Sequence, residues 1–349
     1  MQTRTILAAV SAMLLAAGAV QANDVFNMGS GLTSLTFVTV GNPGNAADVN
    51  FDSNGNPLGS VAYTYQMGTF DVTAAQYCMF LNAVAKTDTY GLYYSGMAGG
   101  PGTAACGINR TGSSGNYSYN TTSGYAVNNG NFPVNYVTWG DAARFCNWLT
   151  NGQPTGSQGA GTTETGSYTL NGATSNAALM AVTRNANAKY VIPTENECYK
   201  AAYYKGGSTN AGYWVYPTQS NTAPSNVLSS VGPNNANYYI TSYTDPTNYL
   251  TVVGAFAASP GPYGTYDMGG DVFQWNEANY LNSYRGLRGG SVDINGIFLR
   301  AAFWNYCSPP GEYGSVGFRV SEVIPEPLTI VAVLMGLGGL GRYVRRRAQ

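Results

Sequence analysis

Residues 264–275 read Gly264-Thr265-Tyr266-Asp267-Met268-Gly269-Gly270-Asp271-Val272-Phe273-Gln274-Trp275. Two later segments also combine glycine with polar or aromatic residues, Arg288-Gly289-Gly290-Ser291 and Gly317-Phe318-Arg319. Short glycine-rich turns here separate aromatic and β-branched runs, a pattern typical of short strands joined by tight turns. The turns also place backbone and side-chain oxygens close together in the sequence, and a hard cation prefers such ligands. We expect the rest of the chain to pack against this segment.

The composition predicts a loop-rich extracellular protein with a packed interior. The 349 residues are 44% hydrophobic and 13% aromatic but only 9% charged, and polar uncharged residues fill the difference. There is no histidine, which excludes His-based triads, His-ligated zinc or iron and imidazole general bases. Residues 23–325 carry 11 Lys and Arg against 16 Asp and Glu, a net charge of −5. We therefore expect no nucleic-acid partner.

The first 22 residues have the pattern of a secretory signal peptide. Arg4 precedes an apolar run from Ile6 to Val20, and the small residues Val20 and Ala22 are placed for cleavage by signal peptidase. The alternative, a buried N-terminal helix, fits the flanking residues less well. We expect residues 23–322 to form the folded domain.

Residues 323–349 predict a second targeting segment. Pro325-Glu326-Pro327 precedes an apolar run from Leu328 to Leu340, and a basic end, residues 342–347, closes the chain. The positive-inside rule holds such an end in the cytoplasm, and the run is short for about 30 Å of hydrocarbon. The segment resembles the PEP-CTERM sorting signal, which an exosortase is thought to remove or transfer. The alternative is an ordinary tail anchor.

Local patterns predict an α+β fold, with helices early and strands late. Capping pairs Thr73/Gln76, Thr138/Asp141 and Thr194/Glu197 each precede an apolar stripe, so we expect helices from these residues to about 85, 149 and 204. Regions 87–132 and 150–188 should be long loops, and the tyrosines of the first favour order over disorder. We expect strands at 35–40, 132–139, 213–216, 250–253, 272–275, 287–292, 298–303 and 316–320.

Several phrases, in this order and spacing over residues 60–321, resemble the sulfatase-modifying factor or formylglycine-generating enzyme family. The resemblance implies a variant of the C-type lectin fold. The phrases are Phe70-Asp71-Val72-Thr73, Pro133-Val134-Asn135-Tyr136-Val137-Thr138-Trp139 with Asp141-Ala142, Ile192-Pro193-Thr194-Glu195-Asn196-Glu197, Tyr263-Gly264-Thr265-Tyr266-Asp267, Arg288-Gly289-Gly290-Ser291 and Gly317-Phe318-Arg319.

The chemistry of the family is not expected here. Its oxidases bind copper through two cysteines just after the Gly-Gly-Ser phrase, where this chain has Ile294 at the first position and Leu299 near the second. An aliphatic side chain cannot replace a thiolate in soft-metal binding, and Cys307 lies too far along the chain. Related iron-dependent sulfoxide synthases need histidines. We expect no copper and no catalytic or cofactor-binding residues, which favours a protein that is not an enzyme while leaving a divergent oxidase as the alternative.

The resemblance also implies two structural calcium sites built from oxygen donors. The alternative is a set of Asx-turns and sheet-edge hydrogen bonds without metal. The loop of the second site is short, and at the first site Gln274 loses the charge of the usual Glu. The first site maps onto Asp267, Gly270, Val272 and Gln274, and the second onto Asn237, Tyr238, Asp245 and Thr247.

The remaining reactive side chains favour structural roles. Five cysteines are an odd number for an exported chain, and Cys78, Cys146 and Cys198 lie on apolar helix faces, where buried free thiols are expected. Glu195 and Glu197 stand at a helix start, where the helix dipole favours carboxylates, so we expect them to stabilise the helix rather than act as an acid/base pair.

The favoured hypothesis is an exported, non-catalytic binding module of the cell envelope or outer surface, or a secreted one. Its ligand is expected to be extracellular polysaccharide or another surface ligand, held by tyrosine- and asparagine-rich loops at 87–132 and 150–188. The alternatives are an oxidoreductase of the formylglycine-generating type with a divergent site and a structural biofilm matrix protein. Signal peptidase and exosortase are the expected processing enzymes, and the C-terminal helix would insert transiently in the membrane.

Overall fold

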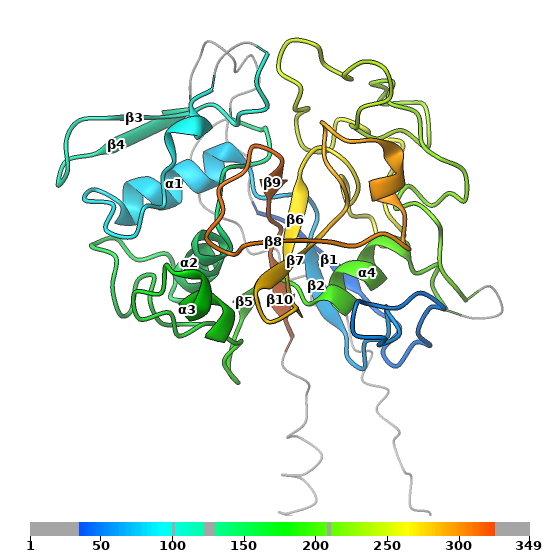
Figure 1. Ribbon diagram of the computed structural model, residues 1–349, viewed down its shortest axis with the longest axis horizontal. Helices are drawn as coiled ribbons and strands as arrows, with labels where there is room; N and C mark the ends of the chain where they lie inside the picture. Colours follow the sequence, from blue (N-terminus) through cyan, green and yellow to red (C-terminus); the bar gives the residue numbers. More distant parts are fainter. Residues whose placement is uncertain (1–34, 100–101, 122–129, 208–210, 325–349) are drawn as a thin grey trace, which may run out of the picture.

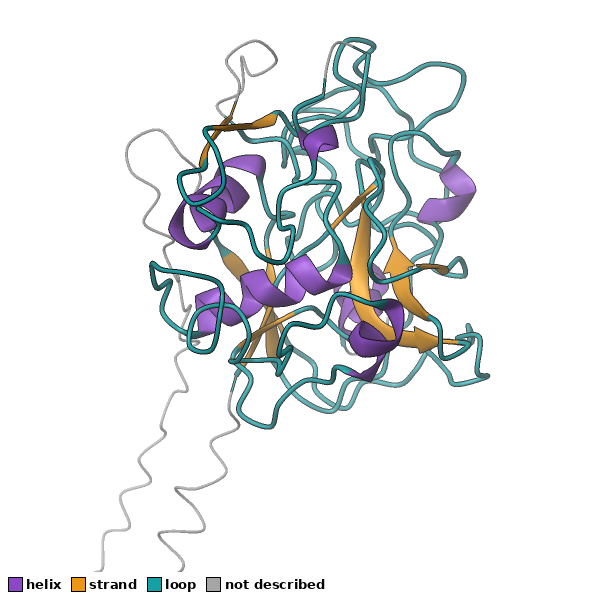
Figure 2. Ribbon diagram, turned by 60° about the vertical axis from the view of Figure 1, so that its left-hand side comes forward, coloured by secondary structure: helices purple, strands orange, loops and turns teal. Residues whose placement is uncertain are grey.

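The computed structural model describes residues 35–99, 102–121, 130–207 and 211–324 (Figure 1). Both predicted targeting segments, 1–22 and the apolar run 328–340, lie outside these residues. Within the described ranges, no helix has the length and apolarity needed to cross a membrane. The elements alternate between short helices and short strands, with loops making up much of the length (Figure 2).

The three predicted helices form where the capping pairs stand. They are α1 (Ala74–Val84), α2 (Trp139–Thr150) and α4 (Glu195–Tyr203). In each, the threonine hydroxyl accepts a hydrogen bond from the N3 backbone, and the N3 side chain accepts one from the threonine backbone. A further helix, α3 (Asn176–Ala181), lies in the stretch predicted to be a loop, where Ser175 caps it.

Two four-stranded sheets occupy the middle of the molecule (Figure 1). In the first sheet β10 lies between β2 and β5, so strands from both ends of the domain pair with one another. The second sheet has the order β8-β7-β6-β9, and β6 and β9 run parallel. The strands are β1 (Phe37–Val40), β2 (Tyr65–Gly68), β5 (Tyr190–Val191), β6 (Phe273–Tyr280), β7 (Tyr284–Arg288), β8 (Asn305–Cys307), β9 (Val316–Gly317) and β10 (Ser321–Val323).

The largest core lies between α1, α2 and the strands. Phe145 of α2 contacts Phe80 of α1 and Phe318 in edge-to-face geometry, with ring centroids 5.4 and 5.3 Å apart. Trp139 and Trp275 are fully buried, and each indole N–H donates to a backbone carbonyl. Burial of each such ring stabilises the fold by about 1.5–3 kcal/mol, which explains why the helices cover the sheets at these positions.

Several strand predictions were wrong. Residues 298–303 begin in the 3-10 helix η3 (Gly296–Leu299), which starts after the Asn295 cap. Residues 132–139 and 213–216 form only isolated bridges, and 250–253 are irregular. In the first long loop region a 3-10 turn, η1 (Ser95–Met97), and a hairpin of β3 (Ile108–Thr111) with β4 (Ser118–Thr121) form instead. The apolar residues of the wrongly predicted strands pack against other elements without joining a regular sheet.

Candidate functional site

Three carboxyl groups, those of Asp71, Asp267 and Asp271, lie near one another where residues 264–275 lead into β6, and Arg319 lies beside the first two. Asp71 and Asp271 are buried, and Arg319 lies 3.3 Å from an Asp71 oxygen. Among the described residues, neither Asp71 oxygen has a hydrogen-bond partner. Burial raises the pKa of Asp71 to about 8 although Arg319 opposes it, and burial together with the charge of Asp267 raises the pKa of Asp271. Burial therefore favours the protonated, uncharged form of both carboxyl groups.

The four predicted ligands of the first calcium site lie together but are joined by hydrogen bonds. The Gln274 amide donates to the Asp267 carbonyl (2.7 Å), and the Gly254 backbone donates to the Asp267 carboxylate (2.6 Å). Arg319 Nε in turn donates to Gln274 Oε1 (3.3 Å). Gly270 has a left-handed φ of 89°, and a Cβ there would lie 2.3 Å from the Asn237 carbonyl oxygen. Calcium here stays a prediction and would require the Gln274 amide to turn its oxygen inward.

The second predicted site is spread over two turns. Asp245 accepts hydrogen bonds from the backbones of Thr247 (2.7 Å) and Asn248, and the Tyr238 carbonyl accepts one from Asn226 (3.2 Å). These are the bonds of an Asx-turn, the alternative considered above. Calcium at this set also stays a prediction.

Asn237 holds the one unsatisfied oxygen of this set among the described residues. Its amide nitrogen donates to the Tyr249 carbonyl (2.9 Å) and to Asp271 (3.1 Å). Its side-chain oxygen is buried with no hydrogen-bond partner in the described part of the chain. Asp271 accepts two further bonds from Thr251. The Asp271 carboxylate thus fastens the loop that contains Asn237 to the residues around Thr251.

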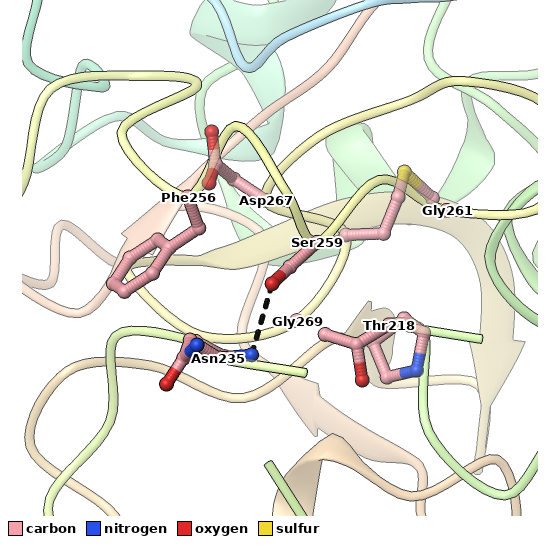
Figure 3. Close-up of a pocket in the computed structure, with 10 residues that line it drawn as sticks. Thr218, Asn235, Phe256, Ser259, Gly261, Asp267 and Gly269 are labelled. Carbon is pink, nitrogen blue, oxygen red and sulfur yellow. Dashed lines mark hydrogen bonds between the residues drawn. The ribbon is translucent and has the colours of Figure 1, made fainter. Parts of the chain in front are cut away.

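A small enclosed cavity lies beside Asp267 (Figure 3). Its space, about 10 Å³, is enough for roughly one water molecule. On its lower side in the view of Figure 3, the backbone N–H of Asn235 donates to the Ser259 hydroxyl (2.9 Å), and the Asp267 carboxylate points away from this bond. The cavity is too small for an organic ligand.

The positions that the resemblance gives to the copper cysteines hold packed aliphatic side chains. Leu299 is fully buried with Tyr216 and Tyr238, and its carbonyl accepts a hydrogen bond from the Tyr203 hydroxyl (3.0 Å). Ile294 is partly buried against the main core. In the described ranges, no group of three or more His, Cys, Asp or Glu side chains is arranged to hold a metal ion.

The thiols and the α4 carboxylates have structural surroundings. All five cysteines are free and four of them are buried, as expected for Cys78, Cys146 and Cys198. Glu197 caps α4 and pairs with Arg184 (3.0 Å); burial acts to raise its pKa, but Arg184 and the cap hydrogen bonds lower it. Glu195 pairs with Arg288 and accepts from Asn276. The predicted role of Glu197 at the helix start is confirmed, while Glu195 holds Arg288 and Asn276.

A polar cleft of about 560 Å³ separates the two long loop regions. Its rim has exposed hydroxyls and one ammonium group, from Lys86, Thr87, Thr89, Thr155 and Ser157. Gln158 forms part of its wall, where it accepts from the Tyr90 backbone (2.9 Å) and donates to Asp88. The wall also includes Asn82, Ala83, Val84, Gly115 and Gly156. The two loop regions therefore meet in a single polar surface.

Most of the described tyrosines in the first loop region are partly buried, and Tyr119 is buried. The Arg110 guanidinium lies over the rings of Tyr93 (4.7 Å) and Tyr117 (4.3 Å), and the Tyr119 hydroxyl donates to the Ala85 carbonyl. Tyr94 is 39% exposed. The Arg110 guanidinium thus contacts two of these rings, and the presentation of rings to a ligand stays a prediction.

Comparisons with known proteins agree with this architecture. No curated protein sequence matches the chain. Similar solved structures are that of CarF (20% identity, 84% of this chain and 100% of that chain covered, TM-score 0.51), Treponema denticola variable protein 1 (19%, 84% and 96%, 0.48) and PvdO from Pseudomonas aeruginosa (18%, 86% and 98%, 0.47).

The likeness to CarF shows the fold alone, and it agrees with the predicted α+β, C-type lectin-like architecture. The model of the sulfatase-modifying factor enzyme 1-like domain matches residues 35–324, which is most of the sequence. The chain therefore belongs to the sulfatase-modifying factor enzyme 1-like domain family.

Proposed function

We propose that this protein is an exported, non-catalytic binding module for extracellular polysaccharide, located in the cell envelope or released from it. Residues 1–22 would direct export, with signal peptidase as the processing enzyme. Residues 323–349 would hold the chain briefly in the membrane until an exosortase acts on them. The intact mass of the native protein tests both ends, since an uncleaved chain would have the mass of all 349 residues.

One observation supports the proposed loss of catalysis. Copper oxidation of a thiol needs two accessible thiolates, and Leu299 is both aliphatic and fully buried. Its neighbour Phe298 packs on Phe303 with ring centroids 4.2 Å apart, so the η3 turn is held by apolar contacts. The chain keeps the scaffold of the family while the η3 region serves as core.

The cleft between the long loops supports a carbohydrate ligand. Its exposed side chains are hydroxyls, the Asn82 amide and a single cation, Lys86, and neutral donors and acceptors match the hydroxyls of a sugar polymer. A site for nucleic acid would instead need a basic stripe.

Calcium is proposed as a structural ion at the second predicted site. Asn237 Oδ1 is a buried oxygen without a hydrogen-bond partner in the described residues, and an ion there would satisfy it. Asn237 and Asp245 side chains with the Tyr238 and Thr247 carbonyls would hold the ion and fix the loop between them.

Two measurements on the full chain test the proposal. The first is calorimetric titration with neutral and acidic polysaccharides, in calcium and in chelator, and we expect binding to at least one polymer. The paired variant Thr87→Val/Thr155→Val should weaken binding if the cleft takes part, with exposed Thr169→Val as the matched control. The second is oxygen consumption with a thiol peptide and copper. Formation of an aldehyde from the peptide cysteine would overturn the proposal in favour of an oxidase.

A further inference from the structure

A strip of four aromatic rings crosses three strands of the second sheet. It consists of Tyr280 at the end of β6, Tyr284 at the start of β7, and Trp304 and Tyr306 at β8; we call it the aromatic strip. Tyr280 pairs with Tyr284, and Tyr306 pairs with Gly286, two residues after Tyr284. Residues that pair directly share a face of the sheet, as do residues two apart on one strand. The register therefore places these rings on one face.

The rings contact one another in offset geometry. Trp304 stacks on Tyr280 with centroids 5.1 Å apart and planes 16° apart, and it stacks on Tyr306 at 5.9 Å and 26°. Tyr284 lies 4.8 Å from Tyr306. Tyr280 is 1% exposed and forms the base. Tyr306 is 36% exposed, while Trp304 and Tyr284 are half-buried. The outer three rings thus offer a surface supported from beneath.

The polar groups at the edge of the strip are uncharged. Asn282 is exposed in the β6–β7 turn beside Leu281, which is 68% exposed. Tyrosine hydroxyls add further donors and acceptors. No member of the strip carries a charge that could pair with an acidic polymer.

We propose that the aromatic strip is a binding surface for an uncharged polysaccharide. The face of an aromatic ring is electrostatically negative and attracts polarised C–H groups, which a pyranose ring presents on its flat side. Asparagine amides and tyrosine hydroxyls are suited to the sugar hydroxyls at the ring edge. The inference rests on the proposed function, but it places the polymer on the sheet rather than in the cleft between the long loops.

The experiment is calorimetric titration of the full chain, in a detergent without a sugar headgroup, with cellohexaose, laminarihexaose and an alginate oligosaccharide. Tyr306→Leu and Trp304→Leu should each weaken binding of the neutral hexamer about three- to tenfold, the range expected for one aromatic contact. Tyr306→Phe keeps the ring and should bind as the native chain does. Tyr94→Leu is the matched control, because Tyr94 is 39% exposed but lies on another surface. Near-ultraviolet circular dichroism reports whether each variant is folded. If Trp304→Leu does not fold, Tyr284→Leu replaces it in the titration.

The outcomes separate this inference from the proposed function. Weakening by the strip variants alone supports both. If a neutral hexamer binds and only Thr87→Val/Thr155→Val weakens that binding, the aromatic strip is not the binding surface, but the polysaccharide function stands. Binding of alginate but of neither neutral hexamer also overturns the strip. If the native chain self-associates and Tyr306→Leu abolishes this, the strip is a contact between copies of the chain, and the proposed binding surface is overturned. Failure to bind any polymer removes both.

Discussion

The buried ion pair between Arg144 and Glu164 should control the stability of the second long loop. Arg144 of α2 donates to Glu164 through Nε (2.7 Å) and Nη2 (3.1 Å), and the two side chains are 1% and 5% exposed. Glu164 also accepts from the Gly172 backbone (2.7 Å), and Arg144 donates to the Ala173 carbonyl (3.0 Å). The pair therefore fastens the loop to the helix at several points.

Removal of one partner leaves the other buried and charged. Arg144→Met should lower the free energy of unfolding by about 3–5 kcal/mol, the usual cost of breaking a buried pair. Glu164→Gln should cost a similar amount because the guanidinium loses its counter-charge, although the amide oxygen can still accept from Gly172. The double variant has no buried charge at this place, so we expect it to cost clearly less than the two single changes together.

The assay is urea unfolding of the four proteins, followed by tryptophan fluorescence, because Trp139 and Trp148 lie in α2. Limited proteolysis within residues 151–175 gives a second, local measurement, since a loop that is no longer fastened opens more often. The control is Arg300→Met, because Arg300 is exposed and forms no salt bridge within the described residues, so its loss should cost little. Costs that simply add in the double variant would refute the argument from buried charge.

Three further predictions concern the carboxylate cluster, a helix cap and the proposed ion. Burial raises the pKa of Asp71 from 3.8 to about 8. Protonation of Asp71 therefore stabilises the folded state fully below about pH 4, and this stabilisation is lost as the pH rises to 8. Urea titrations should show the free energy of unfolding falling by up to about 1.4 kcal/mol per pH unit in this window, and falling less steeply for Asp71→Asn. An identical slope in the variant would contradict this. Thr194→Ala removes the hydroxyl that accepts from the Glu197 backbone (3.1 Å) and should cost about 1 kcal/mol. The control is Thr174→Ala, because Thr174 is exposed and its hydroxyl forms no hydrogen bond within the described residues; an equal midpoint for both variants would count against the cap. Millimolar calcium should raise the Tm of the native chain but not of Asn237→Ala, and a chelator-insensitive Tm in the native chain would argue against the ion.

The helices could be predicted because their signals are local. A threonine and an acceptor three residues later fix both ends of one hydrogen-bonded turn, so Thr73, Thr138 and Thr194 mark the helix starts without any knowledge of the rest of the fold. The short α3 was missed because six residues give no apolar period. The apolar residues 298–303 suggested a strand, but Asn295 accepts from the Ile297 backbone and turns the chain into η3.

The candidate site depended on partners far apart in the sequence. Arg319 contacts Asp71 and the carbonyl of Gly68, about 250 residues earlier, and Asn237 meets Asp271 across another loop. Neither pairing follows from periodicity or spacing. The one signal available was that Asp71, Asp271 and Arg319 stand beside the glycine-rich and β-type phrases that define the domain, which marked their positions but not their contacts.

Buried arginines hold together the segments that identify the family's scaffold. Arg288 of the Arg-Gly-Gly-Ser phrase pairs with Glu195 and donates to the carbonyls of Ala301 and Phe303, while Arg319 binds the carbonyls of Gly68 and Tyr266. Each guanidinium thereby satisfies backbone groups of segments that lack a regular ladder of their own. The phrases that identify the domain are accordingly fold determinants. They do not depend on η3, where Leu299 packs as an apolar core residue.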